Sequence, residues 1–528
     1  MIASISIVLY CQYPLLINKF AINDDVRQES YFYLQHQDPE LFQGDFIVDY
    51  YKKWWPWGMN IVIMLYSIVG LFYDPIQFTK ILPFFLCSLS ALYMFKIGES
   101  LRGAVTGFLS GFMFILIAWS RDYFETFGTS DVADFSVLFC IMFIYYFLKN
   151  DFLKAGINIL LLAIFYPPLL LICLSTYAIS LIFDFFISHK IERHKFIIFI
   201  GAVIIIMAAF VSKYSQGQIK LISLNEMRGM EEFYPGGRVP TLYPSFYNRW
   251  ANPESGLAID YPLKWLFFIS LLVFLILRKR ALSAIPFSLW NFIFASFALF
   301  IISNIFMLLL YSPSRYARYS LPIFLIFFIT LNINNLCGII KSKGSRLFFL
   351  SVFVFFMAFS LMPKLRVGDC IIAPSPNLYR FLQTLPKDVL IAGHPSLMDN
   401  VPTFAKRKAF ITEELSLPYH TNLYPIIKER TYDFFKAYYS DNLGKICDFC
   451  KIYNIAYIIV DKKHFTESYF IEEHFYLNPF NNYIKNLVKN KTTFALMNIP
   501  QNKKIFEDDG VFVVKVEDET SMGFCVKR

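Results

Sequence analysis

The chain has 528 residues, of which 56% are hydrophobic and 17% charged, and its formal net charge is +9. The apolar residues form runs long enough to cross the roughly 30 Å hydrocarbon core of a bilayer, which indicates an α-helical polytopic membrane protein rather than a soluble one. Basic residues cluster in short segments between these runs, as cytoplasmic loops do, so the positive charge does not predict a nucleic-acid partner.

Residues 1–20 predict a first transmembrane helix rather than a cleavable signal peptide, because they lack a basic start and a small-residue cleavage site. The following segment, residues 22–54, carries seven acids and three bases, and two of the acids, Asp24 and Asp25, are adjacent at its start. We expect this segment to form an outer loop at residues 21–56.

If the apolar run "WGMNIVIMLYSIVGLFY" (57–73) crossed the membrane completely, the segments on either side of it would not both lie on the sides of the membrane that their charges predict. We interpret it as a re-entrant or surface-lying helix of the first outer loop. The preceding "YKKWWPW" supplies the lysine and tryptophan residues typical of a membrane interface.

The remaining runs alternate between the two sides of the membrane. The run at 155–187 is too long for one crossing, and "YPP" (166–168) predicts a break because proline removes a backbone donor and restricts the residue before it. About eleven spans of roughly 20 residues each result, with the N-terminus cytoplasmic. The segments expected in the cytoplasm are 95–103, 148–154, 188–195, 278–280 and 341–346; those expected outside are 120–134, 214–262, 311–319 and everything after 364.

The last 164 or so residues change in character and predict a small α/β domain. Short β-rich runs ("DVLIAG", "AYIIVDK", "GVFVVKVE") alternate with stretches of helical spacing ("YPIIKERTYDFFKAYY", "KICDFCKIYN"). The expected organisation is a transmembrane domain over residues 1–364, with outer loops 21–56 and 214–262, and an extracytoplasmic domain over residues 365–528. The pair "CDFC" at Cys447 and Cys450 lacks the second pair of a zinc site, which leaves a local disulfide or two free thiols.

Three segments expected outside the membrane carry side chains that could together form a catalytic site. They contain Asp24 and Asp25, then Asp131 in "SRDYFETFGTSD", and finally Arg315 and Arg318 in "SPSRYARYSLP". A carboxylate can take a proton from an attacking hydroxyl, and the planar fork of arginine binds phosphate oxygens. These residue types would serve displacement of a phosphate leaving group from a lipid-linked sugar.

The chain resembles the C-type superfamily of polytopic glycosyltransferases, which includes protein O-mannosyltransferases, oligosaccharyltransferases and aminoarabinose transferases. The resemblance is carried by "NDD" after the first helix, "DPELFQGDF" in the same loop, "FKIGESLRGAVTGFLSGFMFILIAWS", "TFGTSDVADF" and "SRYARYSLP". It implies the same membrane fold with an outer C-terminal α/β domain.

The resemblance also implies roles for individual residues. Asp24 or Asp25 would activate the acceptor, Asp131 would position the acceptor or a metal, and Arg318 or Arg315 would contact the donor phosphate. Lys53, in "KKWWPWG", stands where some members have a lysine before paired prolines. Some members need a divalent cation such as Mg²⁺ or Mn²⁺ and others do not; if one is present, Asp131 and Asp25 are its expected ligands.

The expected function is therefore an inverting glycosyltransferase of the plasma (inner) membrane, working on the extracytoplasmic face. It would move a sugar from a polyprenyl-phosphate donor to a glycan, lipid or protein acceptor. Membrane lipids are the other expected partners. A glutamate motif like that of oligosaccharyltransferases is not evident, which favours transfer to a hydroxyl over transfer to asparagine. The alternatives are a transporter or flippase of lipid-linked glycans, which would place charges within its spans, and a non-catalytic envelope scaffold.

Overall fold

The computed structural model describes residues 2–54, 60–120, 130–188, 192–215, 222–243, 257, 262–277, 285–306, 310, 312–365, 370–472, 475–489, 491–516 and 524–525. The chain forms two compact units. Unit 1 comprises Met1–Asp24, Ile76–Gly217 and Pro244–Cys370, and unit 2 comprises Asp25–Pro75, Gln218–Tyr243 and Ile371–Arg528. Each unit is therefore assembled from segments that are distant in the sequence.

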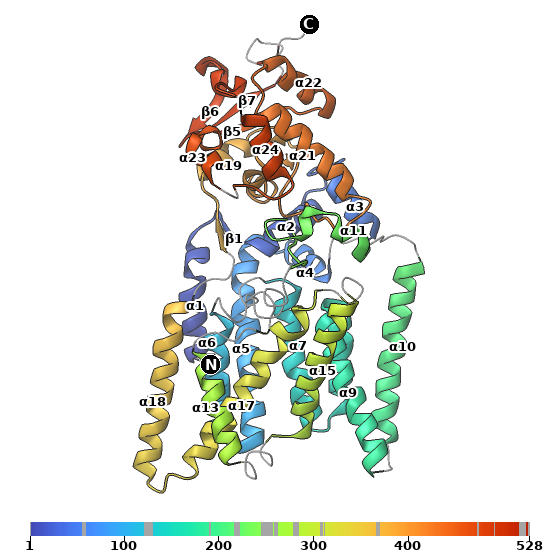
Figure 1. Cartoon of the computed structure of the whole chain (residues 1–528), viewed down its shortest axis with the longest axis vertical. Helices are drawn as coiled ribbons and strands as arrows, with labels where there is room; N and C mark the ends of the chain where they lie inside the picture. The colour runs from blue at the N-terminus through green and yellow to red at the C-terminus, as the bar shows by residue number, and fades with distance from the viewer. Residues whose placement is uncertain are drawn as a thin grey trace. The chain divides into compact units, whose positions relative to one another are not determined.

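Unit 1 is built from apolar helices that run side by side (Figure 1). Its principal helices are α1 (Ile2–Ile17), α5 (Pro75–Arg102), α6 (Ala104–Ala118), α7 (Val132–Leu148), α8 (Phe152–Phe165), α9 (Pro167–Phe183), α10 (Arg193–Ser215), α13 (Leu263–Ile276), α15 (Phe287–Ile305), α17 (Ser320–Cys337) and α18 (Lys343–Leu361), with the short α16 (Arg315–Arg318) before α17. Each expected run contains a helix. Among the described residues, five helices are long and apolar enough to cross a membrane, so the chain is a polytopic membrane protein, and the exact number of spans stays a prediction.

The break expected within residues 155–187 is confirmed at Tyr166. This residue has an extended backbone (φ −153°, ψ 98°) and separates α8 from α9, whose first two residues are prolines. Proline cannot donate a backbone hydrogen bond, and its ring disfavours helical geometry in the preceding residue. The local sequence therefore divides a long apolar run into two helices.

Glycines allow the helices α5 and α6 to pack closely. A Cβ atom at Gly107 of α6 would lie 2.8 Å from the backbone oxygen of Phe95, and one at Gly98 of α5 would lie 2.8 Å from the backbone oxygen of Thr106. Small residues on facing helices permit such close backbone approach, as is common in membrane proteins. A larger side chain at either position would force α5 and α6 apart.

Unit 2 contains a five-stranded mixed sheet and short helices. Its helices are α2 (Asp24–Gln37), α3 (Phe46–Trp54), α4 (Ile61–Val69), α11 (Leu224–Arg228), α19 (Pro376–Gln383), α20 (Pro395–Met398), α21 (Tyr424–Tyr438), α22 (Leu443–Tyr453), α23 (Glu467–Ile471) and α24 (Phe480–Val488). The sheet order is β4 (Lys408–Ala409), β3 (Leu390–Ala392), β5 (Tyr457–Asp461), β7 (Val511–Lys515), β6 (Lys504–Asp508). Two further strands, β1 (Ala21–Asn23) and β2 (Cys370–Ile372), pair separately.

The central strand β5 joins the parallel and antiparallel halves of the sheet. It pairs in parallel with β3 and in antiparallel with β7, in register from Tyr457–Lys515 to Asp461–Val511. All five residues of β5 are buried, which explains their nearly continuous apolar sequence. The strands and helices expected from the C-terminal sequence are thus present, which confirms a small C-terminal sheet domain.

The first outer segment packs with C-terminal residues inside unit 2. The ammonium group of Lys387 lies 2.6 Å from a carboxylate oxygen of Asp38 and 2.8 Å from one of Glu40, and the guanidinium of Arg430 lies 3.9 Å from the ring centroid of Phe46. The compact units therefore divide the chain differently from the expected boundary at residues 364 and 365, because outer-loop residues contribute to the C-terminal fold. The functional division at that boundary stays a prediction.

The run at 57–73 forms a short helix in the part that the structure describes. The helix α4 has nine residues, whereas a crossing takes about 20. Asn60 begins it by accepting hydrogen bonds from the backbone nitrogens of Val62 and Ile63. This length agrees with a re-entrant or surface-lying helix.

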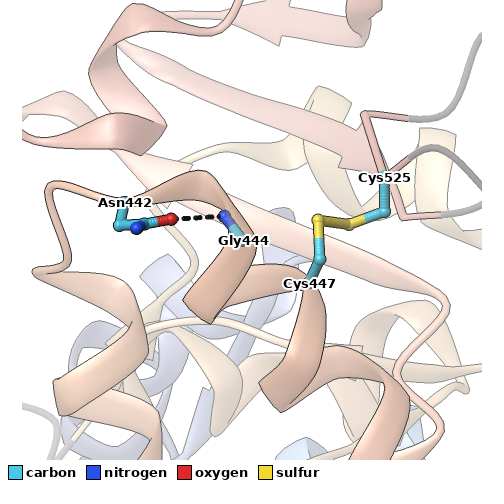
Figure 2. The surroundings of a disulfide bond; sticks show 4 residues. All are labelled: Asn442, Gly444, Cys447 and Cys525. Carbon is cyan, nitrogen blue, oxygen red and sulfur yellow. Dashed lines mark hydrogen bonds between the residues drawn. A yellow bond between two sulfur atoms is a disulfide. The ribbon is translucent and has the colours of Figure 1, made fainter.

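Cys447 of α22 forms a disulfide with Cys525 near the C-terminus (Figure 2). Neither alternative inferred from "CDFC" is therefore correct: the partner of Cys447 lies 78 residues away, and the buried Cys450 is not part of this disulfide. The helix α22 begins at Asn442, whose side chain accepts a hydrogen bond from the backbone nitrogen of Gly444 (Figure 2). The disulfide ties the chain end to this helix.

Removal of this disulfide is expected to destabilise unit 2. A cross-link that closes a loop of this length removes conformational entropy from the unfolded chain, worth about 4 kcal/mol. Cys447→Ser should therefore lower the midpoint of thermal unfolding in detergent. Cys370→Ser, which removes a partly buried free thiol, is the control and should leave the midpoint nearly unchanged; equal effects of the two substitutions would contradict the prediction.

Candidate functional site

The acidic pair Asp24 and Asp25 forms the start of α2. The strand β1 ends at Asn23, α2 begins at Asp24, and both aspartates are partly buried. Negative side chains in the first turn of a helix interact favourably with the partial positive charge of its N-terminus. The division of the chain into units falls between the two acids: Asp24 is the last residue of the first segment of unit 1, and Asp25 begins unit 2.

The second acid, Asp131, is the N-cap residue of α7. The preceding Ser130 has a positive φ of 56°, and its hydroxyl donates to the carbonyl oxygen of Thr79 in α5. The backbone nitrogen of Ser130 donates to a carboxylate oxygen of the buried Asp134 at 2.8 Å. These bonds fix the start of α7 against the first turns of α5.

The residue after Thr79 is a buried lysine. Lys80 is 1% exposed, and its ammonium donates to the carbonyl oxygen of Asn18 at 2.9 Å. Asn18 in turn accepts a hydrogen bond from the backbone nitrogen of Phe20 through its side chain. The same turn of α5 therefore contacts the segment that leads into Asp24 and the segment that leads into Asp131.

Sequence reasoning did not single out Lys80. Its signal is visible in "PIQFTKILPFF", where one cation interrupts an apolar helix. Ionisable residues inside membrane helices are rare and are commonly functional. Lys80 therefore joins the candidate residues.

The arginine pair lies on α16, in unit 1. A guanidinium nitrogen of Arg315 donates to the hydroxyl of Tyr319 at 2.7 Å. The ring of Tyr319 meets that of Tyr166 edge-on, with centroids 5.7 Å apart. Arg315 and Arg318 are both partly buried, so they are not simply extended into water.

Ring contacts continue from this tyrosine pair to the second acid. Phe165, next to Tyr166, lies 5.0 Å from Phe135 between ring centroids. Phe135 is in the first turn of α7, one helical turn after Asp131. The structure thus connects the Asp24, Asp131 and Arg315 segments through contacts within unit 1, while Asp25 and Lys53 belong to unit 2.

Lys53 lies at the exposed end of α3. This helix begins at Asp45, whose carboxylate accepts hydrogen bonds from the backbone nitrogens of Ile47 and Val48 at 3.0 and 3.1 Å. Burial raises the pKa of Asp45 to about 6, although the two hydrogen bonds act in the opposite direction. A role of Lys53 at a donor phosphate stays a prediction.

The helix α2 is held within unit 2 by buried polar contacts. The guanidinium of Arg27 donates to the side-chain oxygen of Asn400 at 2.9 Å and lies 3.6 Å from the carboxylate of Asp399. One turn further, the hydroxyls of Ser30 and Thr403 are 2.7 Å apart. The orientation of the helix that begins with the two aspartates is therefore fixed by the C-terminal residues.

The described part of the chain does not contain a preformed site for a divalent cation. Among those residues, no three histidine, cysteine, aspartate or glutamate side chains are grouped so that they could hold a metal ion. The expected ligands Asp131 and Asp25 belong to different units. The role of Asp131 and Asp25 as metal ligands stays a prediction.

Comparison with solved structures finds similar folds in the oligosaccharyltransferase of Archaeoglobus fulgidus. The TM-scores are 0.54 for its apo form, 0.51 for the enzyme tethered to an acceptor peptide containing the NVT sequon, and 0.50 for the complex with an inhibitory peptide and a dolichol-phosphate. Each comparison covers 89% of this chain and 70% of the other, at 11% sequence identity. No protein-family model and no curated protein matches the sequence. The chain therefore shares the fold of this oligosaccharyltransferase, in agreement with the membrane fold that its resemblance to C-type glycosyltransferases implied.

The raised pKa of Asp45 predicts a pH dependence of stability. The folded state holds the proton more tightly than the unfolded state, whose aspartate titrates near the ordinary value of 3.8, so stability should fall as pH rises from about 4 to about 6. Asp45→Asn keeps an acceptor for the start of α3 without the charge. It should raise the thermal unfolding midpoint at pH 7.5, by the equivalent of up to about 3 kcal/mol, with little effect at pH 4.

The control for this measurement is Asp49→Asn, which removes an exposed acid from the same helix. It should leave the midpoint unchanged at both pH values. If Asp45→Asn lowers the midpoint at pH 7.5, the buried carboxylate stabilises α3 as a charged group and the expected sign is wrong.

Proposed function

We propose that this protein is a membrane glycosyltransferase that moves a sugar from a polyprenyl-phosphate donor to an acceptor on the extracytoplasmic face. The observation that supports the proposal is the series of contacts within one unit that links the segments of Asp24, Asp131 and Arg315. The fold of an oligosaccharyltransferase supports it. The solved relative binds a dolichol-phosphate and an inhibitory peptide in one structure, which is consistent with a lipid-linked donor here.

A carboxylate of the acidic pair would activate the acceptor. An ionised aspartate can accept the proton of an attacking hydroxyl as the oxygen approaches the anomeric carbon. Asp24 and Asp25 both lie in the first turn of α2, where the helix dipole favours the charged form. Asp131, at the start of α7, would orient the acceptor from the second segment.

The arginines would bind the donor phosphate. The bond from the anomeric carbon to the phosphate oxygen breaks as the acceptor oxygen attacks from the opposite face, and inversion at that carbon results. The departing phosphate keeps its negative charge and needs no proton from a strong acid. Arg315 and Arg318 are positioned on α16 by the buried Tyr316 and Tyr319, and their guanidinium groups can form charge-assisted bonds to phosphate oxygens.

An apolar cavity in unit 1 suits the lipid chain of such a donor. The cavity has a volume of about 810 Å³ and is formed largely by α13, α15 and α17. Its wall reaches Leu321 of α17, three residues after Arg318, and also includes Trp290 and Phe324. A polyprenyl chain in this cavity would place its phosphate near α16.

The extracytoplasmic placement of unit 2 is also part of the proposal. Structural disulfides persist in oxidising compartments and are rare in the cytosol, and unit 2 contains the bond between Cys447 and Cys525. The basic segments at 188–195, 278–280 and 341–346 would lie on the opposite, cytoplasmic side.

Loss of the acceptor-activating carboxylate should abolish most turnover. In membranes supplied with radiolabelled polyprenyl-phosphate sugars, we expect Asp24→Asn or Asp25→Asn to reduce transfer about 10²- to 10⁴-fold, the usual contribution of a general base. Asp131→Asn should also reduce transfer. Asp49→Asn, an exposed acid in the same outer segment, is the matched control. A scaffold or a transporter would retain its function in all of these variants, so normal activity of Asp24→Asn, Asp25→Asn and Asp131→Asn would refute the proposal.

Replacement of an arginine on α16 should act on the donor rather than on the acceptor. Arg318→Met is expected to raise the KM for the lipid-linked donor and to lower kcat, while the KM for the acceptor changes little. Arg346→Met, which removes an exposed arginine of α18, serves as the control. Equal kinetic constants for Arg318→Met and the wild type would show that Arg318 does not bind the donor phosphate.

A further inference from the structure

Three consecutive large side chains follow α4 and are exposed. Leu71 is 71% exposed, Phe72 86% and Tyr73 49%, and Ile68 in the last turn of α4 is 47% exposed. Exposed apolar side chains that occur singly are normal on protein surfaces, but a contiguous patch marks an interaction surface. The patch defined by Ile68, Leu71, Phe72 and Tyr73 therefore requires a partner.

The opposite side of α4 is already occupied. Val62, Ile63, Tyr66 and Ser67 are buried, so the helix packs into unit 2 by one face and presents the patch from its C-terminal end. The patch itself is not covered by the described residues of the chain, because its side chains are exposed.

The position of the patch in the chain identifies that partner as lipid. A single residue, Asp74, separates Tyr73 from Pro75, where α5 begins, and α5 has the length and composition of a membrane-spanning helix. The patch is thus covalently held within one residue of the start of a crossing. Leucine, phenylalanine and tyrosine are the residue types that enter the interfacial region of a bilayer.

We propose that Leu71, Phe72 and Tyr73 insert into the outer interfacial region of the bilayer and anchor the C-terminal end of α4 in lipid. The apolar side chains of Leu71 and Phe72 would reach the acyl boundary, with the tyrosine hydroxyl at the level of the headgroups. This contact does not depend on the proposed sugar transfer.

Three contacts between α2 and α4 couple the position of the patch to that of α2. The side-chain nitrogen of Asn60 donates to Glu29, the rings of Tyr33 and Tyr66 meet edge-on at 5.5 Å, and the side-chain nitrogen of Gln37 donates to the carbonyl oxygen of Gly70 at 2.8 Å.

The pairs occur in the same order along both segments, so α2 and α4 run in the same direction. Gly70, at the last of these contacts, immediately precedes the patch. Lipid contact at the end of α4 is thereby coupled to the helix that begins with the two aspartates.

The test uses fluorophores attached to single cysteines in the full chain. Phe72→Cys and Ile471→Cys are each made in a Cys370→Ser background, labelled with an environment-sensitive nitrobenzoxadiazole and reconstituted into phosphatidylcholine vesicles. Ile471 is the matched control, because it is an exposed apolar side chain (80%) of the C-terminal part of unit 2. We expect the label at residue 72 to be quenched by spin-labelled lipid and protected several-fold from aqueous iodide, with the reverse at residue 471.

Two results would overturn the proposal. Equal iodide quenching at residues 72 and 471 would place the patch in water, and protection of residue 72 from both quenchers would mean that protein covers it. Leu71→Cys and Tyr73→Cys report on the same patch if Phe72→Cys fails to give the wild-type thermal unfolding transition. No sugar donor is used, so the outcome is independent of the enzymatic assay.

Discussion

The buried ammonium group of Lys80 constrains how the segments that lead to Asp24 and Asp131 pack against α5. A charged side chain among apolar helices is costly unless hydrogen bonds replace its water, and the carbonyl oxygen of Asn18 provides one such bond. The neighbouring carbonyl of Thr79 accepts the hydroxyl of Ser130. Hydrogen bonds of two adjacent residues of α5 therefore bring together the segments of Asn18 and Ser130, which are more than a hundred residues apart in the sequence.

Unit 2 meets a related constraint in a different way. The guanidinium of Arg27 is buried between α2 and the segment of Asp399 and Asn400, and a buried cation that lost these partners would be strongly destabilising. The first outer segment is thus held by the C-terminal residues through charged contacts as well as through packing. Loops that carry functional groups are commonly positioned by a rigid scaffold in this manner.

Local signals in the sequence predict much of the fold. The prolines after Tyr166 place a helix break, and the apolar runs of the C-terminal region place β3, β5 and β7. Residues 22–54 are expected as an outer loop between membrane helices, and their polar composition does not predict α2 and α3, which the structure contains there. Tertiary contacts to the C-terminal residues stabilise these helices, and such contacts have no local signature.

Long-range pairings could not be predicted from sequence. Cys447 has a nearby cysteine at position 450, yet it pairs with Cys525, which is 78 residues away in the sequence. Asp24, Asp131 and Arg315 could be selected by residue type and by their position after apolar runs. The segments of Asp131 and Arg315 are linked by ring contacts through Phe135, Phe165 and Tyr166, residues that by themselves predict only burial.

The paired contacts between α2 and α4 have a geometric consequence for the two acids. All three pairs lie on the C-terminal side of Asp25, as does the contact of Arg27 with Asn400. One residue inserted between Asp25 and Val26 would leave every one of these contacts intact but would swing both carboxylates by about 100° around the helix axis. The direction in which the two carboxylates point therefore depends on the number of residues that separate them from these contacts.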